Sequence, residues 1–444
     1  MVNTIVGKLA QIVYFVTNKI PTSGVLFFFR RLKMEERLTT ILKHLVSFNT
    51  ESPPARNTDP LQNDIEKFLS GLNFNVSKYP LYPNDSVIVA VLKGKDPKAP
   101  KLILNGHIDV ASVDDPKYWN SNPFELVEKD NRLYGRGVSD MKGGLAGLFY
   151  NLEKLFEEGR QPLGDIIIHS VVGEEVGEAG TKLACQHSPQ ADLAIVLDTS
   201  NLVAQGQGGC ITGWITIESP ETVHDGNRIN MVHAGGGLMA ASAIEKMAKI
   251  IMALKELENH WAVMKSSPDM RSGVNTINPA VIEGGRNPAF IADKCRLWIT
   301  VHYLPQENYK DIIEEIETYL NQVALADVWL KDNPLKYEWG GESMIEDEGE
   351  IFPSFTLPID HPGLMMLSNA YKNIRGSDLP KSMSTSVTDG GWLHEFGIPT
   401  ILFGPGEFEQ AHSVNESIDK QELIDFTRIL YEFLSDWYDN PRTK

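Results

Sequence analysis

Segments with helical periodicity alternate with short apolar runs between residues 35 and 198. Apolar residues recur every three or four positions, as in amphipathic helices, at 35–48, 61–72 and 142–158. Short runs rich in Val, Ile and Leu predict strands at 87–94, 101–106, 165–172 and 192–198. This alternation predicts an α/β fold, in which helices cover a mixed, mostly parallel sheet.

The pattern changes after residue 207. Strands are predicted at 213–219 and 295–305, and helices at 237–257 and 311–324. The first pattern then returns, with a buried strand at 398–406 and an amphipathic helix at 420–438. We therefore predict a compact α+β domain at 208–325, inserted between two parts of the α/β domain at 34–207 and 326–444.

The first 33 residues form a separate segment in this interpretation. They contain no acid, carry five basic residues and include the apolar runs IVYFV and VLFFF. Each run is too short to span a bilayer, and polar residues between the runs interrupt the continuous apolar core of a secretory signal, which is the less favoured alternative. We expect an extension of unknown role at 1–33, with the folded unit beginning near Met34.

Composition and charge narrow the classes of partner. With 444 residues, of which 42% are hydrophobic and 23% charged, the chain has the composition of a globular protein and the length of two domains. Its formal net charge of −18 repels phosphate backbones and anionic membrane surfaces, so we expect neither nucleic acid nor a membrane as partner. The three cysteines lack C-x-x-C spacing and predict reduced thiols in a cytoplasmic protein.

Residues of the metal-binding type follow two of the first apolar segments. His107 and Asp109 end a predicted strand, and a carboxylate often orients an imidazole that binds zinc. Asp140 lies in the glycine-rich turn GRGVSDMKGG, where a carboxylate could bridge two cations. A purely structural role is the alternative for all three residues. His107 and Asp109 could cap the end of the strand, and Asp140 could cap the helix that follows it.

Further candidates follow later strands. The adjacent acids Glu174 and Glu175, then Asp198 and His412, each come directly after an apolar run, although acids at a helix N-terminus are an alternative for the first two. Together these residues would meet at the sheet edge where α/β folds bind ligands. Their nitrogen and oxygen donors suit two divalent ions of zinc, manganese or cobalt that share Asp140, which leaves Glu174 free as a general base.

Four motifs stand in order along the chain: GHIDV, GRGVSDMKGG, GEEVGEAGT and FGPGEFEQAHSVNE. They resemble the motifs of the co-catalytic zinc metallopeptidase and aminoacylase family, which includes acetylornithine deacetylase, succinyl-diaminopimelate desuccinylase and glutamate carboxypeptidase. The resemblance covers nearly the whole chain from Met34. It implies two divalent ions per subunit, with zinc favoured over cobalt or manganese, and no other cofactor.

The resemblance also implies roles for individual residues. The ion ligands would be His107 and Asp198 on one ion, Glu175 and His412 on the other, and Asp140 between them. Asp109 would orient His107, and Glu174 would be the general base.

The family further implies a lid domain that forms a homodimer and carries a histidine across to stabilise the oxyanion in the partner's site. His233, in MVHAGGGLMAASAIEKM, takes that place, although three residues common in the family after it are replaced here. His224 is the alternative. His302 stands where many relatives carry an arginine, which weakens the expectation of a substrate α-carboxylate.

The predicted function is therefore a metal-dependent amide hydrolase that removes an acetyl, succinyl or formyl group from a small amine. One branch of the family deformylates an aminomethylpyrimidine in thiamin salvage, and the segment NTINPAVIEGGRNPAFIADKCRLWITVH resembles that branch. A di- or tripeptidase is an alternative, because it shares every metal ligand. A non-catalytic binding protein is the least favoured alternative, because it should have lost ligands or the base.

Overall fold

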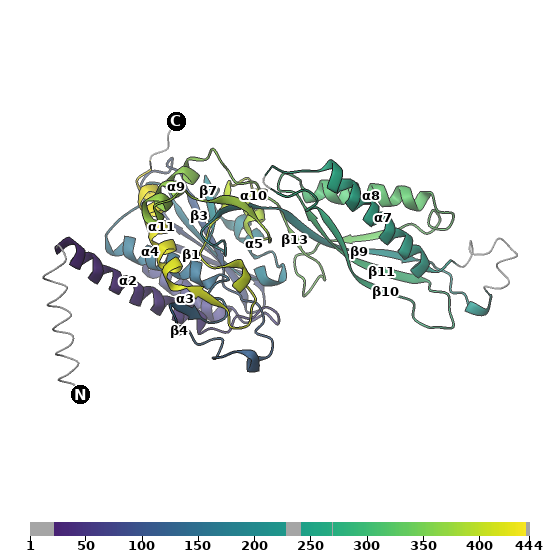
Figure 1. The fold of residues 1–444 in the computed structure, drawn as a ribbon, viewed down its shortest axis with the longest axis horizontal. Helices are drawn as coiled ribbons and strands as arrows, with labels where there is room; N and C mark the ends of the chain where they lie inside the picture. The colour runs from purple at the N-terminus through teal and green to yellow at the C-terminus, as the bar shows by residue number, and fades with distance from the viewer. Residues whose placement is uncertain (1–21, 228–240, 269, 441–444) are drawn as a thin grey trace.

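The computed structural model describes residues 22–227, 241–268 and 270–440, with side chains from residue 34 onward. Two lobes follow one another along the long axis of the molecule (Figure 1). Each lobe has its own hydrophobic core, and each core packs around its own sheet.

The larger sheet of the described residues has eight strands in the order β1-β2-β6-β3-β7-β15-β8-β14. Their bounds are β1 Asn75–Tyr82, β2 Asp85–Leu92, β3 Leu102–His107, β6 Ile166–Val171, β7 Leu193–Val196, β8 Ala204–Gln207, β14 Lys381–Ser384 and β15 Thr400–Leu402. The neighbouring strands β6, β3, β7 and β15 run parallel to one another, whereas β1–β2, β2–β6 and β15–β8 are antiparallel pairs. The carboxyl ends of four parallel strands therefore meet at one edge of this sheet.

Helices cover both faces of this sheet (Figure 1). They are α2 Thr22–Val46, α3 Asp59–Gly71, α4 Lys142–Glu157, α5 Gly180–His187, α9 Pro362–Arg375, α10 Gly390–Glu395 and α11 Lys420–Tyr438. Gly106 faces α4, whereas the neighbouring Asn105 bonds to Thr181 of α5, so these helices lie on opposite faces. The helices α2 and α11 pack on α4, and α10 packs on α5.

Gly144 of α4 allows the close contact that positions one part of the candidate site. A Cβ atom at this position would lie 2.0 Å from the carbonyl oxygen of Leu197, so a larger residue would push α4 away from the end of β7. The strand end that carries Asp198 is thereby fixed against α4.

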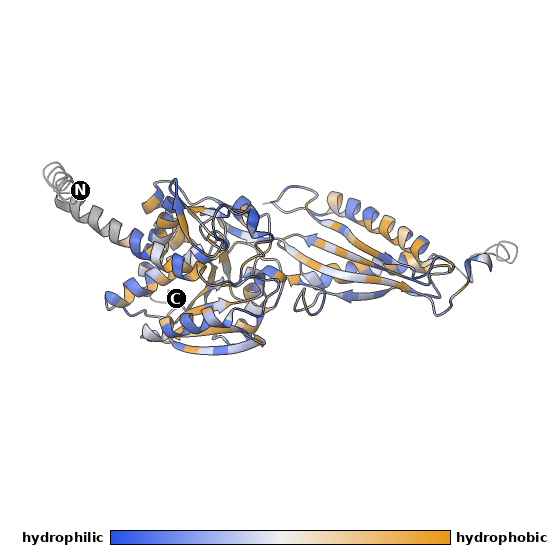
Figure 2. Cartoon of the chain, turned by 90° about the horizontal axis from the view of Figure 1, so that it is seen from below, coloured by the Kyte–Doolittle hydropathy of each residue, from blue (hydrophilic) through white to orange (hydrophobic). Residues whose placement is uncertain are grey.

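The second lobe contains a five-stranded antiparallel sheet within residues 209–352. Its strands are β9 Gly209–Glu218, β10 Thr276–Gly284, β11 Lys294–Tyr303, β12 Lys336–Trp339 and β13 Ile351–Phe352. Two helices, α7 Ala243–Met264 and α8 Tyr309–Leu325, pack on it around Trp261 and Ile299. Hydrophobic and hydrophilic residues alternate along these strands and helices (Figure 2), as expected for elements with one buried face.

Smaller elements complete the first lobe and the connections. A three-stranded sheet consists of β4 Val127–Lys129, β5 Arg132–Tyr134 and β16 Ser417–Asp419. Single 3₁₀ turns are η1 Pro116–Tyr118, η2 Glu174–Val176, η3 Asp225–Asn227 and η4 Phe408–Gln410.

The predicted α/β fold with a mixed sheet is confirmed, as is a second α+β unit. The domain limits at 34–207, 208–325 and 326–444 remain a prediction, and strands β12 and β13 of the second sheet lie beyond residue 325. The helix predicted at 35–48 spans Thr22–Val46 instead, so its backbone extends into the segment predicted as a separate extension at 1–33. No helix in the described part of the chain has the length and apolarity needed to cross a membrane.

Candidate active site

The four parallel strands deliver the predicted residues to one edge of the larger sheet. His107 is the last residue of β3, and Asp198 lies two residues beyond β7. Glu174 and Glu175 form the turn η2 after β6, and His412 follows η4 after β15. Strands that are neighbours in the sheet, though far apart in sequence, thus bring these side chains together.

A first group of ligand atoms surrounds His107. Its Nε2 atom lies 3.2 Å from Asp140 Oδ1 and 3.8 Å from Asp198 Oδ2. The ring is buried, and its Nδ1 atom faces Asp109, 3.0 Å from the backbone oxygen and 3.6 Å from Oδ1. The backbone oxygen of Asp109 therefore orients the imidazole, while the other ring nitrogen faces the cluster.

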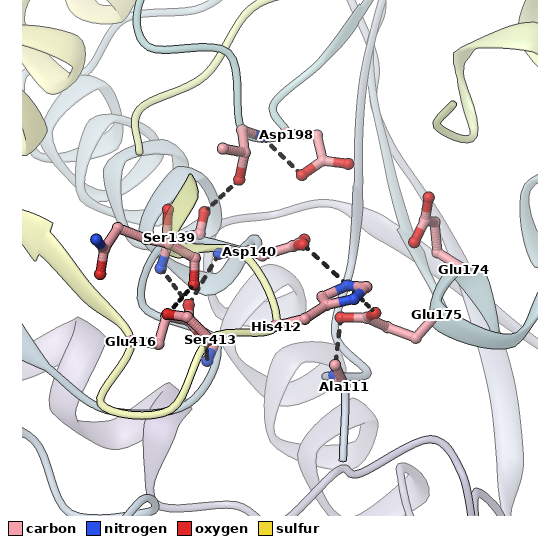
Figure 3. A network of polar contacts seen from close by, with 12 residues as sticks. Ala111, Ser139, Asp140, Glu174, Glu175, Asp198, His412, Ser413 and Glu416 are labelled. Carbon is pink, nitrogen blue, oxygen red and sulfur yellow. Dashed lines mark hydrogen bonds and ion pairs between the residues drawn. The ribbon is translucent and has the colours of Figure 1, made fainter. Parts of the chain in front are cut away.

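A second group surrounds His412 and shares Asp140 with the first. The Nε2 atom of His412 lies 2.7 Å from Glu175 Oε2 and 3.5 Å from Asp140 Oδ2. Figure 3 shows His412 between Asp140 and Glu175, and the second oxygen of Glu175 accepts a hydrogen bond from the backbone N–H of Ala111 at 2.8 Å. In each group, one donor atom from every residue lies within 4.8 Å of the others.

Glu174 is placed differently from Glu175. Its carboxylate points away from His412 (Figure 3), and its Oε2 atom lies 4.0 Å from His107 Nε2. Among the described residues the carboxylate of Glu174 has no hydrogen-bond partner, whereas the carboxylate of Glu175 is held by Ala111 and the backbone N–H of Glu175 donates to Asp109. Glu174 thus faces the cluster without being fixed by protein groups.

Burial and mutual repulsion shift the protonation of these acids. Burial, followed by the charge of Asp140, raises the pKa of Glu175 to about 7 and that of Asp198 to about 8. Burial also raises the pKa of Glu174 well above its usual value. Burial acts in the same direction on Asp140, but the two histidines outweigh it and hold the pKa of Asp140 below its usual range.

The histidines respond in the opposite sense. Contacts with Asp140 and Glu175 raise the pKa of His412 to about 10. The pKa of His107 is raised well above its usual value, because hydrogen bonds to Asp109 and Asp140 outweigh its burial. The acids of the cluster thus favour the protonated, positively charged form of both histidines. A cluster of acids that stabilises positive charge in this way also suits the binding of cations.

The donor set fits divalent metal ions. It offers imidazole nitrogen and carboxylate oxygen, the ligand types of zinc, cobalt and manganese. The Oε2 atom of Glu175 is buried and makes no hydrogen bond of acceptable geometry, although His412 Nε2 is close to it. The two atoms converge in a geometry that could hold a shared cation.

A buried ion pair supports the turn that carries Asp140. Glu416 is fully buried, and its Oε2 atom lies 2.9 Å from Arg136 Nη1. Its carboxylate also accepts hydrogen bonds from the backbone N–H groups of Gly137, Ser139 and Asp140, at 2.9, 2.7 and 3.1 Å. Sequence reasoning did not single out Glu416, although it ends the motif FGPGEFEQAHSVNE.

A cavity of about 550 Å³ opens onto the cluster. Its walls also include side chains that the sequence analysis did not identify, namely Glu350, Phe352, Ser384, Thr388, Phe408 and Glu409. They come from β13 and the residue before it, from the end of β14 and the segment after it, and from η4. Of these residues, Phe408 and Glu409 lie within the motif FGPGEFEQAHSVNE, and no motif marks the others. The cavity therefore combines an acidic floor with hydroxyl groups and two aromatic rings.

Neither of the described candidates for the oxyanion and recognition roles, His224 and His302, lines the cavity. His233 is outside the described residues. His224 is exposed, its Nδ1 atom accepts a hydrogen bond from the N–H of Gly226, and it does not line the cavity. His302 lies on β11 opposite Cys210 of β9 and does not line the cavity either.

Comparisons with known proteins agree with this geometry. Two N-formyl-4-amino-5-aminomethyl-2-methylpyrimidine deformylases are similar over 91% of this chain and 95% of their own length: that of Halalkalibacterium halodurans is 53% identical over 406 residues, and that of Bacillus subtilis is 50% identical over 404 residues.

A solved tripeptidase from Staphylococcus aureus has the same fold, with a TM-score of 0.64 and 20% identity over 91% of this chain and 98% of that one. The model of peptidase family M20/M25/M40 matches residues 103–436, which contain every predicted ligand. The predicted family resemblance is thereby confirmed, and the chain belongs to peptidase family M20/M25/M40.

Proposed function

We propose that this metal-dependent amide hydrolase removes the formyl group from N-formyl-4-amino-5-aminomethyl-2-methylpyrimidine. The observation that carries the proposal is the 53% and 50% identity to two deformylases of that name over 91% of the chain. The predicted ligands and the candidate base lie together at one cavity, which supports a working hydrolase. The product of the reaction would be a primary amine and formate.

The protein groups have separate tasks in this proposal. His107, Asp198, Glu175 and His412 would hold two divalent ions with Asp140 between them, zinc being the favoured metal. Such ions polarise the amide carbonyl and acidify water. Asp109 would orient His107 for this purpose, and its backbone oxygen lies 3.0 Å from His107 Nδ1.

Glu174 takes the proton of the attacking water and returns it to the leaving amine. Its carboxylate faces the cluster, has no competing partner among the described residues, and has a pKa raised by burial, all of which suit a group that accepts and returns a proton. His233 is proposed to stabilise the oxyanion from the partner subunit of a homodimer.

The cytoplasm is the proposed location of the protein, because its three cysteines are free thiols.

The proposal is tested by measuring formate release from the N-formyl pyrimidine in zinc- or cobalt-supplemented buffer. A matched panel contains the N-acetyl and N-succinyl forms of the same amine, acetylornithine, and several di- and tripeptides. We expect selective cleavage of the formyl substrate. Turnover confined to peptides would move the protein to the peptidase branch, and cleavage of every acyl form at equal rates would refute formyl selectivity.

A further inference from the structure

Glu350 has a carboxylate that lines the cavity and lacks a partner. Among the described residues it has neither a hydrogen bond nor an ion pair through this group, and burial alone accounts for the raised pKa of its carboxyl. Phe352 follows two residues later on the extended chain of β13, so both side chains lie on one face and both line the cavity. A half-buried acid without a partner is unfavourable unless a ligand supplies one.

The backbone holds Glu350 firmly in this position. Its N–H donates to Thr212 Oγ1 at 2.9 Å, and its carbonyl oxygen accepts from the Thr212 N–H at 3.2 Å. Gly177, with a φ of 62°, leaves the space that the acid occupies, because a Cβ atom there would lie 2.6 Å from Glu350 Oε2. The carboxylate is thus packed beside the segment that carries Glu174 and Glu175.

We propose that Glu350 selects the leaving amine by binding a 4-aminopyrimidine ring: one carboxyl oxygen accepts from the exocyclic amino group, the other shares a proton with the adjacent ring nitrogen, and Phe352 packs against the ring. The inference rests on the proposed deformylase function. The 4-amino and 5-aminomethyl groups occupy neighbouring ring atoms, so a group that binds the first must lie near the amide that is cleaved. Glu350 meets this requirement, because Gly177 beside it is only two residues from Glu175.

The test pairs a change in the enzyme with a change in the substrate. Wild type and Glu350→Leu are compared on the N-formyl pyrimidine and on an analogue that lacks only the 4-amino group. In wild type, kcat/KM should fall by roughly 10- to 100-fold when the amino group is removed, mainly through KM, because the acid is then left unpaired. In Glu350→Leu the two substrates should differ by less than about 3-fold.

Two further variants keep the test interpretable. Glu350→Gln should recover much of the preference for the 4-amino substrate, because an amide can accept from the amino group and donate to the ring nitrogen. Glu348→Gln, an exposed acid two residues away, should behave as wild type. If Glu350→Leu fails to fold, Glu350→Ala takes its place with the same expected result, because the wild-type comparison alone does not identify the residue that binds the amino group.

Each outcome separates the inference from the proposed function. Equal rates of wild type on both substrates would overturn the inference while leaving the deformylase function intact. The same holds if Glu350→Leu keeps the full preference for the 4-amino group. If wild type releases formate from neither substrate, the proposed function is instead refuted.

Discussion

Glu174 and Glu175 are neighbours in sequence, but their carboxylates face different parts of the cluster. The carboxylate of Glu175 is fixed by Ala111 and lies beside His412, whereas the carboxylate of Glu174 has no hydrogen-bond partner among the described residues. The separation follows from the η2 turn, which makes adjacent side chains diverge.

Glu174→Gln should therefore leave the metal ligands in place and remove the base. We expect a loss in kcat of ~10²–10⁴-fold, with the metal-to-protein ratio unchanged. The measurement is formate release together with elemental analysis of the purified protein, and Glu348→Gln serves as control. Turnover close to wild type would rule out this role for Glu174.

Glu416 acts on the site through the turn that carries Asp140. Glu416→Gln removes its charge, leaves Arg136 buried without its ion partner, and weakens three hydrogen bonds to the turn. We expect a stability loss of about 3–5 kcal/mol and metal affinity lower by roughly 10–100-fold.

The matched control for Glu416 is a second Arg–Glu pair, more exposed, on the same segment. Glu407 lies 3.1 Å from Arg132, and Glu407→Gln should change stability by less than about 1 kcal/mol. Thermal unfolding and calorimetric zinc titration of both variants provide the comparison. Equal effects of the two substitutions would contradict a positioning role for Glu416.

At this scale the sequence predicted the ligands better than their surroundings. His107, Asp140 and His412 stand in motifs whose spacing reflects the chemistry, and the structure brings their donor atoms together. Glu350 and Glu416 could not be assigned roles from the sequence, because burial and pairing depend on segments far away in the chain. Whether a carboxylate is paired is a property of the fold.

Strand β6 contains a buried histidine that sequence periodicity does not explain. His169 is fully buried between β2 and β3, opposite Val89 and Asn105, and neither ring nitrogen has a hydrogen-bond partner in the described structure. Burial lowers the pKa of His169 to about 3. The folded protein therefore keeps this ring neutral where an unfolded chain protonates it.

This histidine should make folding sensitive to acid. Above pH 6.5 neither state binds the proton, but between about pH 6.5 and 3 only the unfolded state does, so stability falls with falling pH by up to ~1.4 kcal/mol per unit. His169→Leu should remove this contribution. The difference in unfolding midpoint between variant and wild type, measured from pH 7 to 4, should increase as pH falls; parallel curves would contradict the assignment.

Element by element, most long periodic segments were predicted well and short or exposed ones were not. The helix predicted at 237–257 is an exception, because α7 spans Ala243–Met264 in the described residues. The helices α4, α8 and α11 lie within a few residues of their predicted ranges because one face of each is apolar. The strand β10 was not assigned, since most of its residues are exposed and it contains Pro279. Its place in the sheet is set by pairing with β11, which local sequence does not encode.

On the scale of the whole molecule, the metal cluster concentrates charge where four strands end. Five acids meet there, Asp109, Asp140, Glu174, Glu175 and Asp198, together with two histidines. Bound cations should offset this repulsion and so stabilise the fold, by about 2.7 kcal/mol at a concentration 100-fold above Kd.

Removal of metal should therefore affect both activity and stability. Treatment with a chelator is expected to abolish formate release and to lower Tm, and added zinc or cobalt should restore both. His412→Ala, which lacks one ligand, should show a smaller change in Tm on chelation. A Tm that does not respond to chelator in wild type would count against cations as a structural component.

The strand β13 belongs to the second sheet by its pairing with β9, but its residue Phe352 and the preceding Glu350 form part of the wall of the cavity at the edge of the first sheet. Bond cleavage and the choice of amine are thus encoded by different layers of the molecule. Mutations in the second sheet can alter which leaving group is accepted while the hydrolytic apparatus stays intact. An ancestral hydrolase with this architecture could acquire new substrates without passing through an inactive intermediate.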